Sequence, residues 1–214
     1  MPPKPRLFGA HYSVYVRIAR LALLEKGVDH DCVPVDIFSS EGVPDWYLER
    51  HPFRRIPAFE HGTLRLFETT AITRYVDEAF TGPALQYSAA AARALTNQIV
   101  GLIDAYAYRA MVWDVYVERL SKPKNGGLCD EARIARGLDT ARTCLTTLAQ
   151  RASDGPWLAG DRLTLADLHA APVFAYFALT EEGAASIEAH PAIAHWWDRM
   201  QARDSMASTA FETS

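Results

Sequence analysis

The sequence predicts two domains of different class: an α/β domain with the element order βαβ-ββα, and then an all-helical (all-α) domain. Short apolar runs bounded by turn residues, which are typical of strands, occur within residues 1–81. Beyond residue 89 no comparable run is found, and apolar residues recur at helical spacing. Residues 81–88 contain Gly82 and Pro83 and form the expected linker. We therefore expect an α/β domain at residues 1–81 and a helical domain at residues 89–214.

The first domain is expected to open with a strand from Lys4 to Gly9 and a helix that is capped by Ser13 and ended by Gly27. The apolar residues of this helix recur at helical spacing: Val14, Ile18, Leu21 and Leu24. Residues 28–35 are expected to form the second strand. A strand, a helix and a strand within about thirty residues predict a right-handed unit with parallel strands.

The rest of the first domain is expected to contain a short helix from Pro44, a β-hairpin and a last helix. The hairpin strands are residues 56–59 and Leu64–Phe67, around a turn at residues 60–63. Thr69 or Thr70 is expected to cap the last helix. A βαβ unit followed by ββα is the thioredoxin-like arrangement.

The second domain is expected to be built from helices alone. Residues 89–120 are long enough for one long or bent helix, and further helices are expected at residues 131–151 and 191–200. Thr164 and Asp167 have the spacing of a capping box, in which the acid bonds back to the backbone of the cap residue. We expect a loop at residues 121–127 and a frayed or surface-draped segment at residues 204–214.

Composition argues against several classes of protein. The chain has 214 residues and a net charge of −4, without the basic patch that nucleic-acid binding requires. The longest near-apolar run, residues 170–179, is too short to cross a membrane, and the start lacks the apolar core of a signal peptide. Cys32, Cys129 and Cys144 lack C-x-x-C spacing and predict neither a disulfide framework nor a zinc site. We expect a cytoplasmic protein.

Four motifs give the chain a family resemblance. They are S-V-Y-V-R at residues 13–17, H-P-F-R-R-I-P at residues 51–57, F-E-T-T-A-I at residues 67–72 and W-L-A-G-D-R-L-T-L-A-D at residues 157–167. In this order they resemble the cytosolic glutathione S-transferases, nearest to the serine-type classes (theta-, zeta- and phi-like). The resemblance implies glutathione as cosubstrate, a hydrophobic electrophile, a homodimer, and no metal or redox cofactor. It departs at Glu41 and Gly42, where phi-like enzymes have a histidine and a lysine.

Five residues of these motifs are predicted to bind glutathione: Arg55, Ile56, Pro57, Glu68 and Thr69. Pro57 cannot donate to a neighbouring strand, and a cis peptide before it would expose the N–H and C=O of Ile56. In the resembled family these groups pair with the cysteinyl backbone of glutathione. Glu68 and Thr69, at a helix N-terminus, suit the charged ends of a γ-glutamyl group, and Arg55 suits the glycyl carboxylate. A strand-edge proline and a plain helix cap are the ligand-free alternatives.

Ser13 is the predicted catalytic residue. A hydroxyl at a helix N-terminus donates a hydrogen bond to a thiolate, and the helix dipole also favours the anion. Ser13 would thereby lower the pKa of the glutathione thiol without being the nucleophile itself. Tyr12 through its phenol and His11 through a ring N–H are competing donors, and Ser13 as a plain N-cap is the structural alternative. A cysteine occupies position 13 in glutaredoxin-like and omega-like relatives, so the serine argues against cysteine-based thiol exchange.

Aromatic and apolar side chains of the second domain are predicted to line an electrophile pocket together with Tyr12. These residues are Tyr106, Tyr108, Val112, Trp113 and Phe174. Core packing and dimer contact are the alternatives for them. The predicted activity is conjugation of the glutathione thiolate to an electrophilic small molecule. A non-catalytic binding or scaffold protein, and a glutathione-dependent isomerase or disulfide reductase, are the alternative functions.

Overall fold

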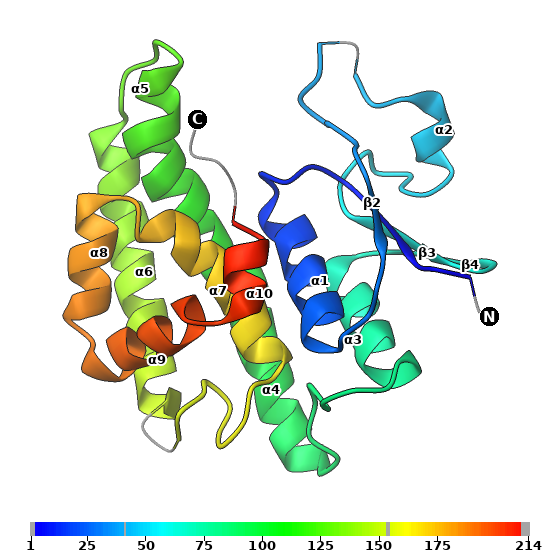
Figure 1. Cartoon of the computed structure of the whole chain (residues 1–214). Helices are drawn as coiled ribbons and strands as arrows, with labels where there is room; N and C mark the ends of the chain where they lie inside the picture. Colours follow the sequence, from blue (N-terminus) through cyan, green and yellow to red (C-terminus); the bar gives the residue numbers. More distant parts are fainter. Residues whose placement is uncertain (1–2, 41, 153–154, 211–214) are drawn as a thin grey trace. The chain divides into compact units, whose positions relative to one another are not determined.

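Four short strands form a mixed sheet with the order β2-β1-β3-β4 (Figure 1). They are β1 (Arg6–Phe8), β2 (Asp31–Val33), β3 (Ala58–His61) and β4 (Leu64–Phe67). β1 runs parallel to β2 and antiparallel to β3, and β3 forms an antiparallel hairpin with β4. The predicted parallel unit, the hairpin and the thioredoxin-like arrangement are confirmed, but the first hairpin strand is Ala58–His61 and not residues 56–59, so the turn is shorter than residues 60–63. The second strand is shorter than the expected residues 28–35, because only Asp31–Val33 pair with β1.

The computed structural model describes residues 3–40, 42–152 and 155–210. It divides into two compact units. The first unit comprises the chain up to Leu85 and the residues from Asp204 onward, and the second comprises Gln86–Arg203. The helices of the first unit are α1 (Val14–Glu25), α2 (Asp45–Leu48), α3 (Thr69–Ala79) and α10 (Asp204–Ser208).

Helices cover both faces of the sheet in the first unit. The ring of Phe59 on β3 lies 5.9 Å from the ring of Tyr75 on α3, and α1 packs beside α3. The ring of Phe8 on β1 lies 6.3 Å from the ring of Tyr47 on α2. Leu7 is paired with Phe59 in register, and successive strand residues point to opposite faces. Leu7 therefore faces α3, whereas Phe8 faces α2.

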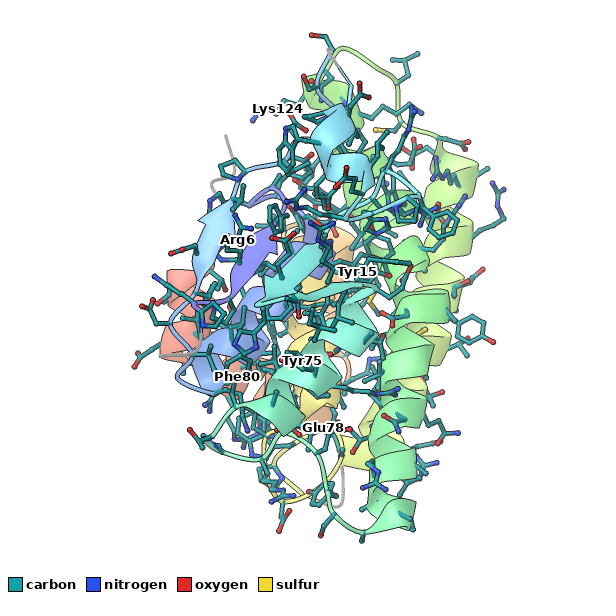
Figure 2. The ribbon with its side chains drawn as sticks, turned by 90° about the vertical axis from the view of Figure 1, so that its right-hand side faces the viewer. Arg6, Tyr15, Tyr75, Glu78, Phe80 and Lys124 are labelled. Atoms are coloured by element: carbon teal, nitrogen blue, oxygen red, sulfur yellow. The ribbon has the colours of Figure 1, made fainter. Side chains whose placement is uncertain are left out.

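The hairpin is tied to the end of α3, where Figure 2 labels Tyr75 and Phe80. The hydroxyl of Tyr75 lies 2.7 Å from Nδ1 of His61, the last residue of β3. The ring of Phe80 lies 4.9 Å from the ring of His61. These contacts fix the turn of the hairpin against the helix that follows it.

Helix α1 begins and ends at the residues that its capping signals predict. The Oγ atom of Ser13, the N-cap, accepts a hydrogen bond from the N–H of Val16 at 3.3 Å. After the helix, Gly27 has a φ of 67°, a left-handed conformation that glycine adopts without strain. Ile18 and Leu21 lie on the buried face and have no exposed surface. The predicted helix is confirmed.

Helix α3 begins differently from the prediction. The helix starts at Thr69, so Glu68 occupies the N-cap position that was expected for Thr69 or Thr70. Glu68 makes no side-chain capping bond, and its φ is 69°. This left-handed backbone turns the chain directly from β4 into the helix and leaves no extended position for a threonine cap.

The second unit is helical (Figure 1). Its helices are α4 (Ala90–Leu102), η1 (Ile103–Ser121), α5 (Lys122–Lys124), α6 (Glu131–Ala152), α7 (Leu165–Phe177), α8 (Glu181–Glu188) and α9 (Pro191–Gln201). The helices predicted at residues 131–151 and 191–200 are confirmed as α6 and α9, and the capping box of Thr164 and Asp167 begins α7. Almost every residue of α7 is buried, and the helix packs against α4, η1 and α9. No helix in the described part of the chain combines the length and the apolar character that crossing a membrane needs.

The long helix predicted at residues 89–120 is continuous but changes its winding at Ile103, where a π-helix begins. Buried residues recur at every fourth position of η1: Ile103, Ala107, Met111 and Val115. The predicted loop at residues 121–127 is correspondingly shorter, because Ser121 ends η1 and Lys122–Lys124 form α5.

The C-terminal region forms a helix, so the prediction of a frayed or draped segment is wrong for residues 204–209, whereas Ala210 is exposed and lies outside the helix. Asp204–Ser208 forms α10, which packs against α1. Met206 is 5% exposed and Thr209 has no exposed surface. Apolar and hydroxyl side chains of this short segment thus belong to the interior of the first unit. The last four residues of the predicted segment, 211–214, lie outside the described residues.

Candidate active site

Ser13 lies half-buried where the loop of residues 10–13 enters α1. Its backbone N–H donates to the C=O of Ala10 at 3.1 Å, and its Oγ accepts from the N–H of Val16 at 3.3 Å. A hydroxyl that accepts a hydrogen bond still has its own proton to donate. The positive end of the α1 dipole favours an anion placed at that proton. The surroundings of Ser13 therefore suit a bound thiolate.

Both competing residues bond to other side chains, but only Tyr12 uses its proton in doing so. The phenol of Tyr12 donates to Oδ1 of Asp36 at 2.6 Å, and burial together with this bond raises the pKa of Tyr12 far above its usual value. The same bond, helped by the N–H of Phe38 at 2.9 Å, lowers the pKa of Asp36. Arg20 donates to Nδ1 of His11 at 3.1 Å, which places the proton of the neutral ring on Nε2. The proton of Tyr12 is engaged by a carboxylate.

The peptide between Ile56 and Pro57 is cis, as the sequence predicts. The loop before it is held from the interior, because the hydroxyl of the fully buried Tyr47 donates to the C=O of Arg55 at 2.8 Å. The side chain of Arg55 is exposed, whereas Ile56 and Pro57 are buried. β3 begins at Ala58, so the backbone of Ile56 lies just outside the sheet. Such a backbone suits an extended peptide that pairs with it as an added strand does.

Gly9 allows the start of α1 to approach the segment with the cis peptide. Its φ is 153°. A β-carbon at this position would lie 2.3 Å from Cγ2 of Val16 and 3.3 Å from Cβ of Ile56. The first distance is shorter than the closest approach of two carbon atoms that are not bonded to each other. The missing side chain at Gly9 therefore brings the first turn of α1, which Ser13 caps, close to Ile56.

Glu68 and Thr69 form the junction between β4 and α3. The backbone of Glu68 lies in a region that residues other than glycine rarely adopt, and strained residues of this kind cluster at functional sites. Its C=O accepts the N–H of Ile72 at 3.0 Å, so the helix starts immediately. Thr69, the first residue of α3, is only 6% exposed. The N-terminus of α3, whose N–H groups suit a carboxylate, thus lies directly beside the exposed side chain of Glu68.

His51 links the parts of the predicted glutathione site, although sequence reasoning assigned it no role. Its ring is 3% exposed and lies 5.0 Å from the ring of Phe67 and 6.5 Å from the ring of Tyr47. Burial lowers the pKa of His51; the nearby negative charge of Glu68 opposes this effect, and the positive charge of Arg55 adds to it. Two predicted ligands of glutathione therefore lie near one buried imidazole. The only signal in the sequence was the place of this histidine at the head of the H-P-F-R-R-I-P motif.

The residues predicted for the electrophile pocket lie on several elements. Tyr12 belongs to the first unit; in the second unit, η1 carries Tyr106, Tyr108, Val112 and Trp113, and α7 carries Phe174. Tyr106 is 61% and Trp113 36% exposed, whereas Val112 is buried. Phe174 has no exposed surface and packs 4.9 Å from Trp196 between ring centroids. Their joint role as a pocket stays a prediction. No group of metal-ligating side chains that could hold an ion is found among the described residues.

Comparison with known proteins matches both halves of the chain. The family described as "Glutathione S-transferase, N-terminal domain" matches residues 7–84, and "Glutathione S-transferase, C-terminal domain" matches residues 128–204. Glutathione S-transferase F11 of Arabidopsis thaliana is 30% identical over 185 residues, which are 86% of each chain. The chain belongs to the glutathione S-transferase family.

Solved structures of other glutathione S-transferases share the whole architecture of this chain. Glutathione S-transferase I bound to lactoylglutathione is 28% identical, with a TM-score of 0.86 over 98% of this chain and 99% of that one. Glutathione S-transferase I from maize, in complex with an atrazine glutathione conjugate, is 27% identical, with a TM-score of 0.83 over 97% and 96%. The predicted fold, a thioredoxin-like domain followed by an all-helical domain, is that of the glutathione S-transferases. Glu41, where the sequence departs from phi-like transferases, lies outside the described residues.

Proposed function

We propose that this member of the glutathione S-transferase family conjugates the thiolate of glutathione to an electrophilic small molecule. The observation that carries the proposal is the difference in hydrogen bonding between two adjacent hydroxyl groups, those of Tyr12 and Ser13. Ser13 accepts a bond from Val16 and keeps its proton, whereas Tyr12 donates its proton to Asp36. Ser13 then donates to the glutathione sulfur and keeps it ionised, so that more nucleophile is present at neutral pH.

The remaining contacts of glutathione follow from the predicted residues. The N–H and C=O of Ile56, which lies just before β3, pair with the cysteinyl backbone as an added strand does. Glu68 binds the ammonium of the γ-glutamyl group, while Thr69 and the N-terminus of α3 bind its carboxylate. The exposed guanidinium of Arg55 binds the glycyl carboxylate. The buried imidazole of His51 lies near the charges of both Arg55 and Glu68.

The electrophile is proposed to be hydrophobic and to contact the exposed aromatic side chains of η1, among them Tyr106 and Trp113. The related maize enzyme was solved with a glutathione conjugate of atrazine, an electrophile of this kind. A homodimer in the cytoplasm is proposed from the family alone. The transition state is stabilised mainly by positioning the two substrates and by keeping the sulfur ionised.

The deciding experiment follows the ultraviolet absorbance of enzyme-bound glutathione thiolate against pH in wild type, Ser13→Ala, Ser13→Thr and Tyr12→Phe. A hydrogen bond to a charged group contributes about 1.5–3 kcal/mol, which corresponds to about 1–2 units of thiol pKa. We expect the pKa of the bound glutathione thiol to rise by this amount in Ser13→Ala only, because Ser13→Thr keeps both the helix cap and the hydroxyl donor. A rise in Tyr12→Phe with none in Ser13→Ala would assign the role to Tyr12.

Retention on immobilised glutathione separates the enzyme from a scaffold protein of the same fold. We expect wild type and Ser13→Ala both to be retained, because the proposed binding residues are unchanged in the variant. A wild type that is not retained and shows no thiolate absorbance would contradict the proposed function. Product analysis with a chlorinated arene, an unsaturated ketone and a glutathione mixed disulfide distinguishes conjugation from isomerisation and reduction.

A further inference from the structure

Helix α10 is hydrogen-bonded to α1 along the length of that helix. Arg17 donates from Nε to Oγ1 of Thr209 at 3.1 Å and from Nη2 to the C=O of Met206 at 3.1 Å. Arg20 donates from Nη2 to the C=O of Ser208 at 3.1 Å. At the far end of α1, the hydroxyl of Ser205 donates to the carboxylate of Glu25. The two arginines thus bind carbonyl groups in the last turn of α10, where basic side chains commonly bind the carbonyls at a helix end.

The bonds of Arg17 and Thr209 are buried. Arg17 is 5% exposed and Thr209 has no exposed surface. The hydroxyl of Thr209 donates to the C=O of Ser205 at 2.8 Å while it accepts from Arg17, so both its donor and acceptor capacities are used. A buried guanidinium is costly unless it is hydrogen-bonded. The side chain of Arg17 is therefore held firmly in one position by α10.

Arg17 also bonds to the backbone of the predicted catalytic residue, and Arg20 bonds to the loop that precedes it. The N–H of Arg17 donates to the C=O of Ser13 at 2.9 Å, which closes the first turn of α1. Arg20 uses its second terminal nitrogen to bind Nδ1 of His11 at 3.1 Å, two residues before Ser13. Ser13 in turn bonds back to Ala10. The loop before Ser13 and the turn after it are thus both anchored on α10.

We propose that α10 is a positioning element for the reaction, and that Arg17, Arg20 and Thr209 are positioning residues that fix the direction of the Ser13 hydroxyl. The inference rests on the proposed function, because it concerns the hydrogen bond from Ser13 to the glutathione thiolate. Hydrogen bonds weaken steeply as their angle departs from linearity. A looser entry into α1 therefore weakens the donation to sulfur, and this effect requires no contact between α10 and the substrate.

The test compares Thr209→Val, which keeps the shape of the side chain but removes the oxygen, with Thr209→Ser, which keeps the oxygen. We expect Thr209→Val to raise the pKa of the bound glutathione thiol, and the acid limb of kcat/KM, by about half a unit to one unit. This corresponds to roughly three- to tenfold less thiolate on the acid side of the transition. Thr209→Ser is expected to titrate like wild type. KM for glutathione is expected to change less than kcat, because the binding residues stay in place.

A second variant keeps the inference testable if Thr209→Val fails to fold. Arg20 is only half-buried, and Arg20→Lys keeps the charge but has a single nitrogen, which cannot bridge His11 and Ser208. We expect a rise of the thiol pKa in the same direction. If the folded variant melts at a lower temperature but its bound glutathione thiol has the wild-type pKa, then α10 only stabilises the fold and the proposal is wrong. Thr209→Val decides this where it folds, and Arg20→Lys decides it where Thr209→Val does not. A wild type without any thiolate signal would instead contradict the proposed function.

Discussion

Tyr12 and Ser13 are neighbouring hydroxyl residues that differ in what holds each proton. The bond from Tyr12 to Asp36 joins a phenol to a carboxylate at 2.6 Å, a charge-assisted bond of the stronger kind. If Tyr12 turned to a thiolate, that bond would be lost. Ser13 already accepts from Val16 and loses no bond when it donates. Asp36, on another loop, therefore determines that Ser13 and not Tyr12 has a hydroxyl proton available for a thiolate.

Replacing Asp36 by asparagine tests this account of Tyr12. The pKa of Tyr12 is raised by burial and, next, by its bond to the carboxylate of Asp36. We expect Asp36→Asn to lower the pKa of Tyr12 toward the ordinary value of about 10, because the second cause is removed. The pKa of the bound glutathione thiol is expected to stay the same. Tyrosinate absorbance during alkaline titration measures the first value, and Tyr12→Phe identifies the signal. An unchanged tyrosine titration in Asp36→Asn would contradict the assignment.

The sequence indicates some residues of the site and is silent on others for a physical reason. Ser13 and Pro57 leave local signals, because a cap precedes an apolar helix and a proline interrupts a strand. Asp36 lies 24 residues from Tyr12, and its role depends on where two loops meet. His51 acts through rings from other elements, which no spacing in the sequence reveals. Contacts between residues that lie far apart in the sequence can be identified only in the folded structure.

Elements with regular apolar spacing and clear ends could be predicted from the sequence, and two others could not. α1 and α6 combine a repeated apolar face with capping or turn residues. The apolar residues of η1 do not distinguish a π-helix from an α-helix in the sequence, and the folded helix packs against α6 and α7. α10 has only five residues, too few for a periodic pattern. Its helix is stabilised by tertiary bonds to α1, since so short a helix is marginal alone.

The capping box of α7 depends on the fully buried carboxylate of Asp167. Its Oδ1 accepts from the N–H of Leu158 and from Nε1 of Trp196, both at 2.9 Å. Its Oδ2 accepts from the N–H of Thr164 at 2.8 Å and from the hydroxyl of that residue at 3.0 Å. Burial raises the pKa of Asp167, and these donors oppose the rise. One carboxylate thus joins the segment before α7 to α9.

Replacement of Asp167 by asparagine is expected to destabilise the protein by about 2–4 kcal/mol. The amide has only one acceptor oxygen, so its NH₂ group would replace one of the two acceptors. It would then face either the donors of Thr164 or those of Leu158 and Trp196, and those hydrogen bonds would be lost. Denaturant unfolding measures the loss. Asp161→Asn is the matched control, because Asp161 is exposed and sits in the same segment. Equal stability of the two variants would contradict the stabilising role given to the Asp167 carboxylate.

At the scale of the whole molecule, the first unit is assembled from both ends of the chain. Arg17 binds Thr209 across 192 positions, and Ser205 binds Glu25 across 180. Sequence patterns describe neighbours along the chain, so they assigned residues 204–214 to the helical domain. The contacts assign α10 to the unit that contains Ser13. Stability and the proposed chemistry are coupled through this return of the chain.

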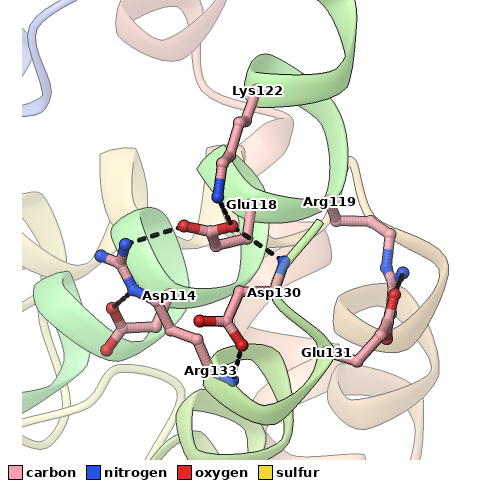
Figure 3. A network of polar contacts seen from close by, with 7 residues as sticks. All are labelled: Asp114, Glu118, Arg119, Lys122, Asp130, Glu131 and Arg133. Carbon is pink, nitrogen blue, oxygen red and sulfur yellow. Dashed lines mark hydrogen bonds and ion pairs between the residues drawn. The ribbon is translucent and has the colours of Figure 1, made fainter. Parts of the chain in front are cut away.

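Acid stability of the molecule is expected to depend on a polar network that joins η1, α5 and α6 in the second unit. Figure 3 shows its members: Asp114, Glu118, Arg119, Lys122, Asp130, Glu131 and Arg133. Glu118 is the buried centre, with 2% of its surface exposed. It accepts from Nζ of Lys122 at 2.8 Å, from the N–H of Asp130 at 3.1 Å and from Nη1 of Arg133 at 2.7 Å. The bond from Lys122 is the main cause that lowers the pKa of Glu118; Asp130 and Arg133 add to it.

A lowered carboxyl pKa stabilises the fold above the pKa of the unfolded chain, about 4.3 for glutamate, and this contribution is lost as pH falls through the folded value. We expect Glu118→Gln to lower the unfolding free energy at neutral pH by about 2 kcal/mol, because bonds between charged groups become weaker ones. As pH falls below about 4.3 and then through the lowered folded pKa of Glu118, the variant should approach wild type, so its acid limb is shallower. Melting temperatures between acid and neutral pH measure both effects. Asp139→Asn, which breaks an exposed pair with Arg142 on α6, is the control and should follow wild type throughout. Parallel curves for wild type and Glu118→Gln would place the acid-sensitive group elsewhere.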